Sequence, residues 1–135
     1  MISDFFDAHH RHWEDAEFLH GDSRWANADH LYGMAAESGL KRLMQAFGMP
    51  VDAIGKPSDS KDRHHVDKIW ARYESYRSGR GQGAYSLPGN PFVDWNVSQR
   101  YARRSEFDRA RVEGHRRGSQ IVRSLLSKAE LEGLI

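Results

Sequence analysis

The sequence predicts an all-α fold, a single domain over residues 1–135 organised as an up-and-down bundle of four to five helices. Apolar residues recur with the 3.6-residue period of amphipathic helices, whereas the alternation of half-buried strands is scarce. A chain of 135 residues has the size of one domain and can bury one hydrophobic core. Hydrophobic residues make up 39% and charged residues 29%, which indicates a folded globular protein rather than a disordered one.

The first two predicted helices share the N-terminal third of the chain. The helical period places one apolar face of the first segment on Ile2, Phe6, Trp13 and Ala16. A longer second helix begins near Arg24, with Asp22 or Ser23 as its N-cap, and ends before Gly48 and Pro50. Its apolar stripe comprises Trp25, Ala28, Tyr32, Ala35, Gly39, Leu43 and Ala46. Both helices are therefore expected to bury one face.

Two further helices are predicted on either side of a glycine-rich loop over residues 78–92. Ser60 can cap the third helix, whose inward residues are Val66, Ile69, Trp70 and Tyr73. The last helix begins near Ser105, with an apolar face on Phe107, Ala110, Gly114, Gly118, Ile121, Leu125 and Ala129. Because glycine costs about 1 kcal/mol in a helix interior, Gly114 and Gly118 indicate close approach by another backbone and a surface suited to self-association.

Charge and residue usage narrow the classes of function. Twenty basic and nineteen acidic residues give a net charge of +1, so no global field favours nucleic acid, although residues 100–123 hold eight arginines. The absence of cysteine excludes disulfides, thiolate catalysis and zinc fingers. No signal peptide or apolar span of about 20 residues is found, which predicts a cytoplasmic protein with no membrane contact.

Neither a metal nor another cofactor is predicted. His9 and His12 have the i,i+3 spacing that a helical metal site can use, but no His-Glu-x-x-His motif accompanies them. The segment "SGRGQG" lacks the Gly-Lys-Ser/Thr ending of a phosphate-binding loop and follows no strand. The remaining possibilities are catalysis by amino-acid side chains without a cofactor, or a binding function without catalysis.

Three segments together resemble HEPN domains over roughly residues 20–130. They are "ADHLYGMAAESGLKRLM" in the second helix, "RHHVDKIW" in the third, and "DWNVSQRYARRSEF" before the last. The resemblance implies an α-helical homodimer of the kind found in bacterial toxin–antitoxin, phage-defence and RNA-cleaving systems. RNA, an antitoxin or a nucleotidyltransferase-type protein are the partners it implies. Other HEPN proteins are non-catalytic binding modules, so fold alone does not choose between these functions.

The HEPN catalytic signature is an arginine followed four to six residues later by a histidine, and two pairs have this spacing. Arg109 and His115 lie in the last helix, where the family places its motif, whereas Arg24 and His30 precede Tyr32 in the second helix. The resemblance implies metal-independent RNA cleavage, with histidine as acid or base and arginine on the phosphate. Both pairs depart from the family, because Ala110 or Trp25 follows the arginine instead of Asn, Asp or His.

The remaining predicted site residues surround the second helix. Glu37 borders the apolar stripe, so its carboxylate needs partners, of which Lys41 is one turn away and Arg100 is the best distant candidate. Substrate contacts are predicted at Tyr32, Glu37, Lys41, Arg100, Tyr101 and Arg104. A core position for Tyr32 and a structural ion pair for Glu37 are the competing interpretations. Two functions stay open: a metal-independent endoribonuclease, or a non-catalytic module that binds a protein or nucleotide beside the second helix.

Overall fold

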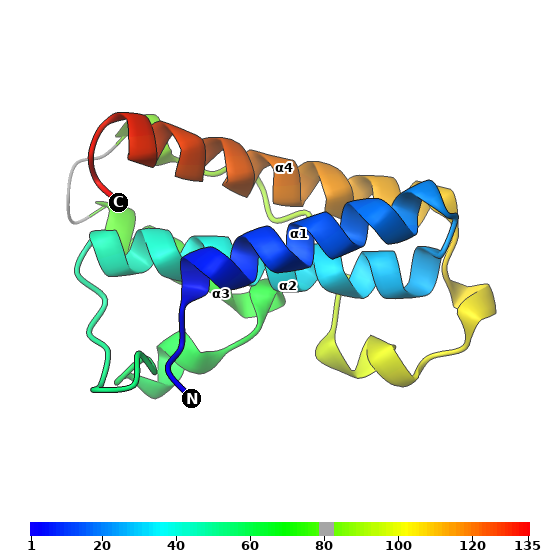
Figure 1. The fold of residues 1–135 in the computed structure, drawn as a ribbon, viewed down its shortest axis with the longest axis horizontal. Helices are drawn as coiled ribbons and strands as arrows, with labels where there is room; N and C mark the ends of the chain where they lie inside the picture. The colour runs from blue at the N-terminus through cyan, green and yellow to red at the C-terminus, as the bar shows by residue number, and fades with distance from the viewer. Residues whose placement is uncertain (79–82) are drawn as a thin grey trace.

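The computed structural model describes residues 1–78 and 83–135, and this part of the chain is all-helical with no named strand (Figure 1). The prediction of an all-α bundle is therefore confirmed. Four α-helices are present in these ranges: α1 (Phe5–Gly21), α2 (Trp25–Ala46), α3 (Val66–Arg77) and α4 (Arg109–Leu131). Short 3-10 turns lie in the connections: η1 (Ser60–Arg63), η3 (Gly83–Tyr85), η4 (Val97–Tyr101) and η5 (Arg104–Glu106).

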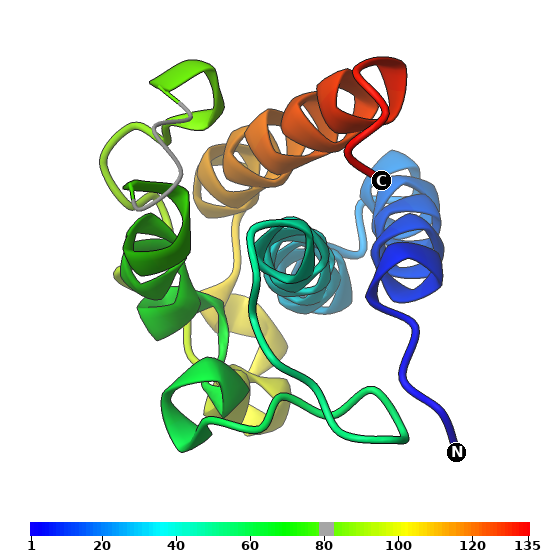
Figure 2. The same cartoon turned by 90° about the vertical axis from the view of Figure 1, so that its left-hand side faces the viewer.

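Helix α2 lies at the centre, with α1, α3 and α4 around it (Figure 2). Helix α1 runs antiparallel to α2, whereas α4 runs parallel to it (Figure 1). Helix α3 also follows the direction of α2, because His65 lies beside Glu37 and Tyr73 lies beside Phe47. The predicted up-and-down alternation is therefore wrong. The long connections before α3 and α4 allow each helix to start again near the beginning or middle of α2.

The chain turns sharply between α1 and α2, and the N-cap of α2 is a different residue from the one predicted. Asp22 is the C-cap of α1, and Ser23 adopts a positive φ of 56° in the turn. Arg24 occupies the N-cap position of α2, where its side chain makes no capping hydrogen bond. The predicted N-cap at Asp22 or Ser23 is therefore wrong. The predicted stop is confirmed, because α2 ends at Ala46 and Gly48 has a φ of 105°.

The other helix starts lie later than predicted. Ser60 begins η1 rather than capping α3, and His65 is the N-cap residue of α3. Asp108 caps α4 by accepting a hydrogen bond from the Arg111 backbone N–H, while Ser105 lies in η5. None of the helices in the described ranges has the length and apolar character that crossing a membrane requires.

The core forms around α2 and confirms most of the predicted apolar stripes. All four inward residues of α3 are buried, as are most of those of α2. The face of α4 is rotated from the prediction, with Ala110 exposed and Val112, His115, Ser119 and Val122 buried. Gly118 does permit close packing, since a Cβ there would lie 2.6 Å from Pro91, whereas a Cβ at Gly114 would enter open space. The Gly118 surface is thus used within the chain.

Candidate active site beside the central helix

Arg109 and His115 do not form the pair that their spacing predicts. Arg109 begins α4 with a side chain that is 75% exposed, and its Nε lies 4.0 Å from Glu113 Oε1. The His115 ring is buried: its Nδ1 is 2.6 Å from Asp29 Oδ1 and its Nε2 is 2.8 Å from Asp94 Oδ1. With both ring nitrogens bonded to carboxylates, His115 has none available for a substrate.

His115 belongs to a buried ion network that joins α2, α4 and the segment before η4. Gln99 donates to Asp29 Oδ2 over 2.7 Å, and the Arg111 guanidinium lies 3.5 Å from the same oxygen. Burial lowers the pKa of His115, but the hydrogen bonds and charges of Asp29 and Asp94 outweigh it, and the net pKa is raised. The network therefore holds an imidazolium and has a structural role.

The second predicted pair is also separated. Arg24 is exposed and donates to Asp22 Oδ2 over 3.1 Å, away from His30. Tyr32 is fully buried, and its hydroxyl donates to Glu17 Oε1 over 2.7 Å. The core position is thus confirmed for Tyr32, and its hydroxyl is bonded within the chain.

His30, in contrast, lies on a rigid aromatic platform. The Trp95 indole packs directly on the α2 backbone at Gly33, where a Cβ would lie 2.1 Å from Trp95 Cε2. The indole Nε1 also donates to the Asp29 carbonyl over 3.2 Å. His30 stacks on this indole with ring centroids 5.6 Å apart and planes 18° apart. Its Nδ1 is buried and bonded to no described residue.

A second imidazole, that of His65, also lies near the Trp95 ring. The His65 ring centroid lies 6.4 Å from that of Trp95. Its Nδ1 donates to Glu37 Oε2 over 3.0 Å, and 42% of its side chain is exposed. A carboxylate that holds one ring nitrogen while the rest of the ring faces solvent is the arrangement of a histidine acid or base.

Glu37 connects this imidazole to Lys41. The Lys41 ammonium donates to Glu37 Oε1 over 2.8 Å, and both side chains are buried. The predicted ion pair of Glu37 with Lys41 is confirmed. The predicted partner Arg100 is wrong, because His65 takes its place and the Arg100 guanidinium lies over the Tyr101 ring. We call His30, Glu37, Lys41 and His65 the acid–base cluster.

The surroundings shift the pKa values of the two imidazoles of the cluster in opposite directions. The hydrogen bond to Glu37 raises the pKa of His65. Burial, followed by the charge of Arg100, lowers the pKa of His30. Burial raises the pKa of Glu37, but His65 and Lys41 outweigh it and hold that pKa below its usual range. The cluster therefore holds two imidazoles whose pKa values are shifted apart, the arrangement that suits paired acid and base chemistry.

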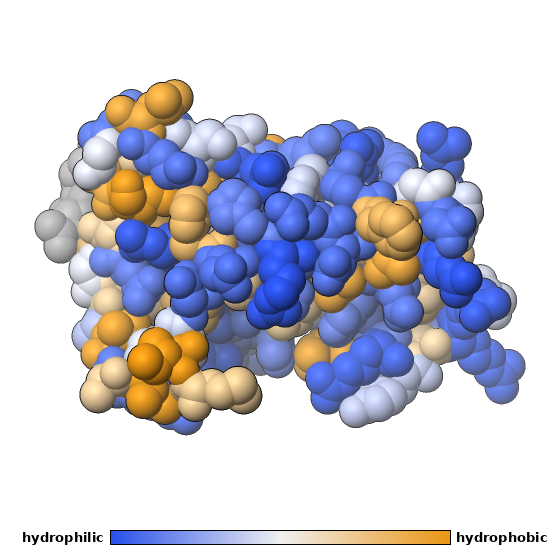
Figure 3. Space-filling model, viewed as in Figure 1, coloured by the Kyte–Doolittle hydropathy of each residue, from blue (hydrophilic) through white to orange (hydrophobic). Residues whose placement is uncertain are grey.

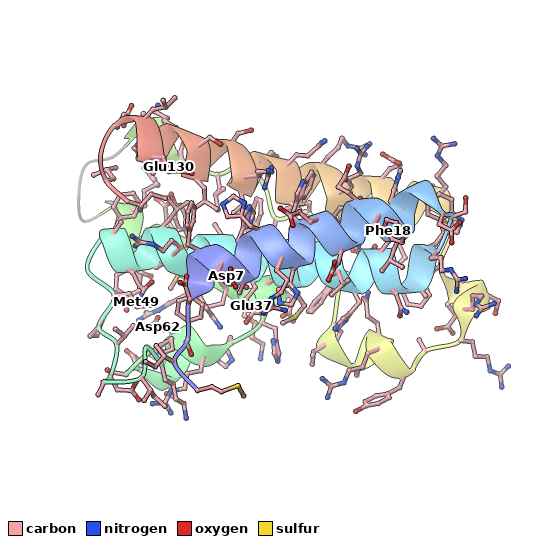
Figure 4. All side chains as sticks on the ribbon, viewed as in Figure 1. Asp7, Phe18, Glu37, Met49, Asp62 and Glu130 are labelled. Atoms are coloured by element: carbon pink, nitrogen blue, oxygen red, sulfur yellow. The ribbon has the colours of Figure 1, made fainter. Side chains whose placement is uncertain are left out.

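The cluster borders an open surface. A groove of about 390 Å³ reaches Glu37 and is also lined by Met34, Ser38 and residues of the N-terminal segment. In the view of Figure 4, Glu37, a residue of α2, lies below α1. The space-filling view shows mainly hydrophilic side chains across the middle of this face, between two lobes (Figure 3). A ligand in this groove would therefore lie next to Glu37.

Within residues 1–78 and 83–135, no group of three or more His, Cys, Asp or Glu side chains is arranged to hold a metal ion. His9 is fully buried with its Nδ1 2.8 Å from the Ala35 carbonyl, and burial lowers its pKa to about 4. His9 therefore serves the α1–α2 contact.

Comparison of the chain with protein-family models, with characterised proteins and with solved structures gave no match.

Proposed function

We propose that the protein is a metal-independent endoribonuclease of HEPN-like type, in a bacterial toxin or defence system, whose active site is the acid–base cluster. One observation carries the proposal: the His30 and His65 rings both lie beside Trp95, and their surroundings shift the two pKa values apart. An acid and a base of this kind suit a reaction that takes one proton and returns another.

The proposed reaction is attack of a ribose 2′-hydroxyl on the adjacent phosphate. Neutral His30 accepts the 2′-OH proton while O2′ forms a bond to phosphorus. The bond from phosphorus to O5′ breaks, and protonated His65 donates its proton to the leaving O5′. The products are a 2′,3′-cyclic phosphate and a 5′-hydroxyl, so atoms and charge balance without a metal or other cofactor.

Positive charge beside the cluster supports an anionic substrate. The Arg100 side chain is exposed on η4, and its charge acts on His30. A guanidinium can neutralise the charge that develops on the phosphorane oxygens. The Lys41 ammonium is bonded to Glu37, and its proposed role is to keep that carboxylate ionised under His65.

The second candidate function is a non-catalytic HEPN module that binds a nucleotide, RNA or a protein such as an antitoxin beside α2. The observation that favours it is that neither Arg–His pair with the HEPN spacing converges. A homodimer belongs to both proposals through the HEPN resemblance. The two functions differ in whether bound RNA is cut.

The direct test is incubation of purified protein with total RNA in EDTA. The proposal predicts cleavage that persists in the chelator and yields fragments with 2′,3′-cyclic phosphate and 5′-hydroxyl ends. Resistance of the 5′ ends to kinase labelling, or loss of cleavage with EDTA, would contradict the chemistry. RNA that is bound but remains intact would support the binding module.

A further inference from the structure

The segment after Trp95 carries an exposed aromatic ring among unpaired arginines. Tyr101 at the end of η4 is 79% exposed, and the Arg100 guanidinium lies 4.9 Å from its ring centroid. Arg103 and Arg104 follow and are also exposed. We call Arg100, Tyr101, Arg103 and Arg104 the η4–η5 surface.

The arginines of the η4–η5 surface differ from Arg111 and Arg116, which are paired with carboxylates. Within the described residues, none of the three forms an ion pair with a carboxylate. Arg111 and Arg116, by comparison, are held by Asp94 and Glu17. Because the net charge of the chain is only +1, this surface is a local excess of positive charge that is free to meet phosphates.

A pocket of about 520 Å³ adjoins this surface. Ala102 and Arg104 line one side, and residues 22–27, including Arg24 and Asn27, line the other. Its volume falls in the range of small-ligand sites. His30 lies one helical turn beyond Asn27 on α2, about 5 Å along the helix axis. The start of α2, which lines the pocket, and His30 of the acid–base cluster therefore lie about one turn apart along the same helix.

We propose that the η4–η5 surface and this pocket form a binding surface for single-stranded RNA, with Tyr101 stacking on an unpaired base and Arg104 contacting phosphate. This inference rests on the proposed function, since it supplies the substrate path to the cluster. An exposed tyrosine among arginines suits single strands, because paired bases in a duplex do not present their faces for stacking.

Binding can be measured apart from cleavage with a fluorescein-labelled 2′-O-methyl oligouridylate of about 12 nucleotides, which has no free 2′-hydroxyl. We expect Tyr101→Ala to weaken binding at low salt by about fivefold or more, as loss of one stacked base would. We expect Arg104→Ala to weaken it and to lower the slope of log Kd against log salt by about 0.7. Fluorescence anisotropy gives both quantities.

Two exposed residues outside the surface serve as matched controls. Phe18→Ala removes an aromatic ring that is 78% exposed on α1, and Arg117→Ala removes an exposed charge from α4. Both variants are expected to bind the oligonucleotide as the wild type does. Equal losses in the controls and in Tyr101→Ala would mean that binding is unspecific and would overturn the inference.

Two further results would overturn the inference: a wild-type protein that does not bind the oligonucleotide, or one that binds a duplex of the same length as tightly. Failure of the nuclease proposal looks different. If only the nuclease proposal fails, the wild type and the two controls would bind the oligonucleotide more tightly than Tyr101→Ala and Arg104→Ala do. Unmodified RNA would nevertheless stay intact in EDTA.

Discussion

Replacing Asp29 with alanine is expected to lower the free energy of unfolding by about 3–5 kcal/mol, the cost of removing one member of a buried ion network. Asp29 is fully buried and accepts hydrogen bonds from His115 and Gln99. Its loss leaves the His115 imidazolium with Asp94 alone and removes the carboxylate beside Arg111. Urea unfolding followed by circular dichroism measures the change.

The loss in unfolding free energy caused by Asp29→Ala should depend on pH. The folded pKa of His115 is raised, so its stabilising charge is fully present below the unfolded pKa of about 6.5 and is lost as pH rises through the folded value. The difference between wild type and variant is therefore largest below pH 6.5 and shrinks above it. Asp94→Ala is the comparison: this side chain is 57% exposed, and a smaller loss is expected. Equal losses in the two variants would contradict the burial of the network.

Replacing His65 with alanine is expected to lower kcat by about 10²–10⁴-fold, the usual contribution of a general acid or base. His30→Ala should lose activity to a similar degree, because the reaction needs both proton transfers. The matched control is His64→Ala, the exposed neighbour of His65, which is expected to cleave RNA at the wild-type rate. Single-turnover cleavage of a labelled RNA measures all three.

Arg109→Ala separates this site from the one predicted by motif spacing. Arg109 is exposed, and the ion pair that it forms is with Glu113, which is not part of the acid–base cluster. Its removal should therefore leave kcat unchanged. A large loss in Arg109→Ala, with full activity in His65→Ala, would contradict the site proposed from the structure. Circular dichroism of each variant checks that the fold is intact.

The helices could be predicted because burial imposes a period on the sequence. The stripe through Ala28, Tyr32, Ala35 and Leu43 identified both α2 and its buried face. The face of α4 was predicted less well, since the buried polar residues His115 and Ser119 carry it and apolar Ala110 is exposed. A hydrophobic pattern does not identify a buried polar residue such as His115, whose ring nitrogens are bonded to Asp29 and Asp94.

The candidate site was only partly predictable, because its contacts join distant segments. Glu37 was expected to need partners, and Lys41 lies one turn away, but His65 reaches it through the connection between α2 and α3. The segment "RHHVDKIW", which contains His65, was placed in the third helix, whereas the contact of the His65 ring with Glu37 was not predicted. The signal missed was Gly33: a glycine inside a helix indicates close approach, here by Trp95.

The pH dependence of kcat/KM for RNA cleavage, measured for wild type and Glu37→Gln, tests the central claim most directly. The wild type should show a bell-shaped profile. As pH increases, kcat/KM rises while His30 loses its proton below pH 6.5, and it falls while His65 loses its proton above pH 6.5. The groups acting on His65 are Glu37, Lys41 and Asp67, and the first of these raises its pKa most. Glu37→Gln should therefore move the alkaline limb to lower pH and leave the acid limb largely in place. An alkaline limb that does not move in Glu37→Gln would contradict the assignment of His65 as the acid held by Glu37.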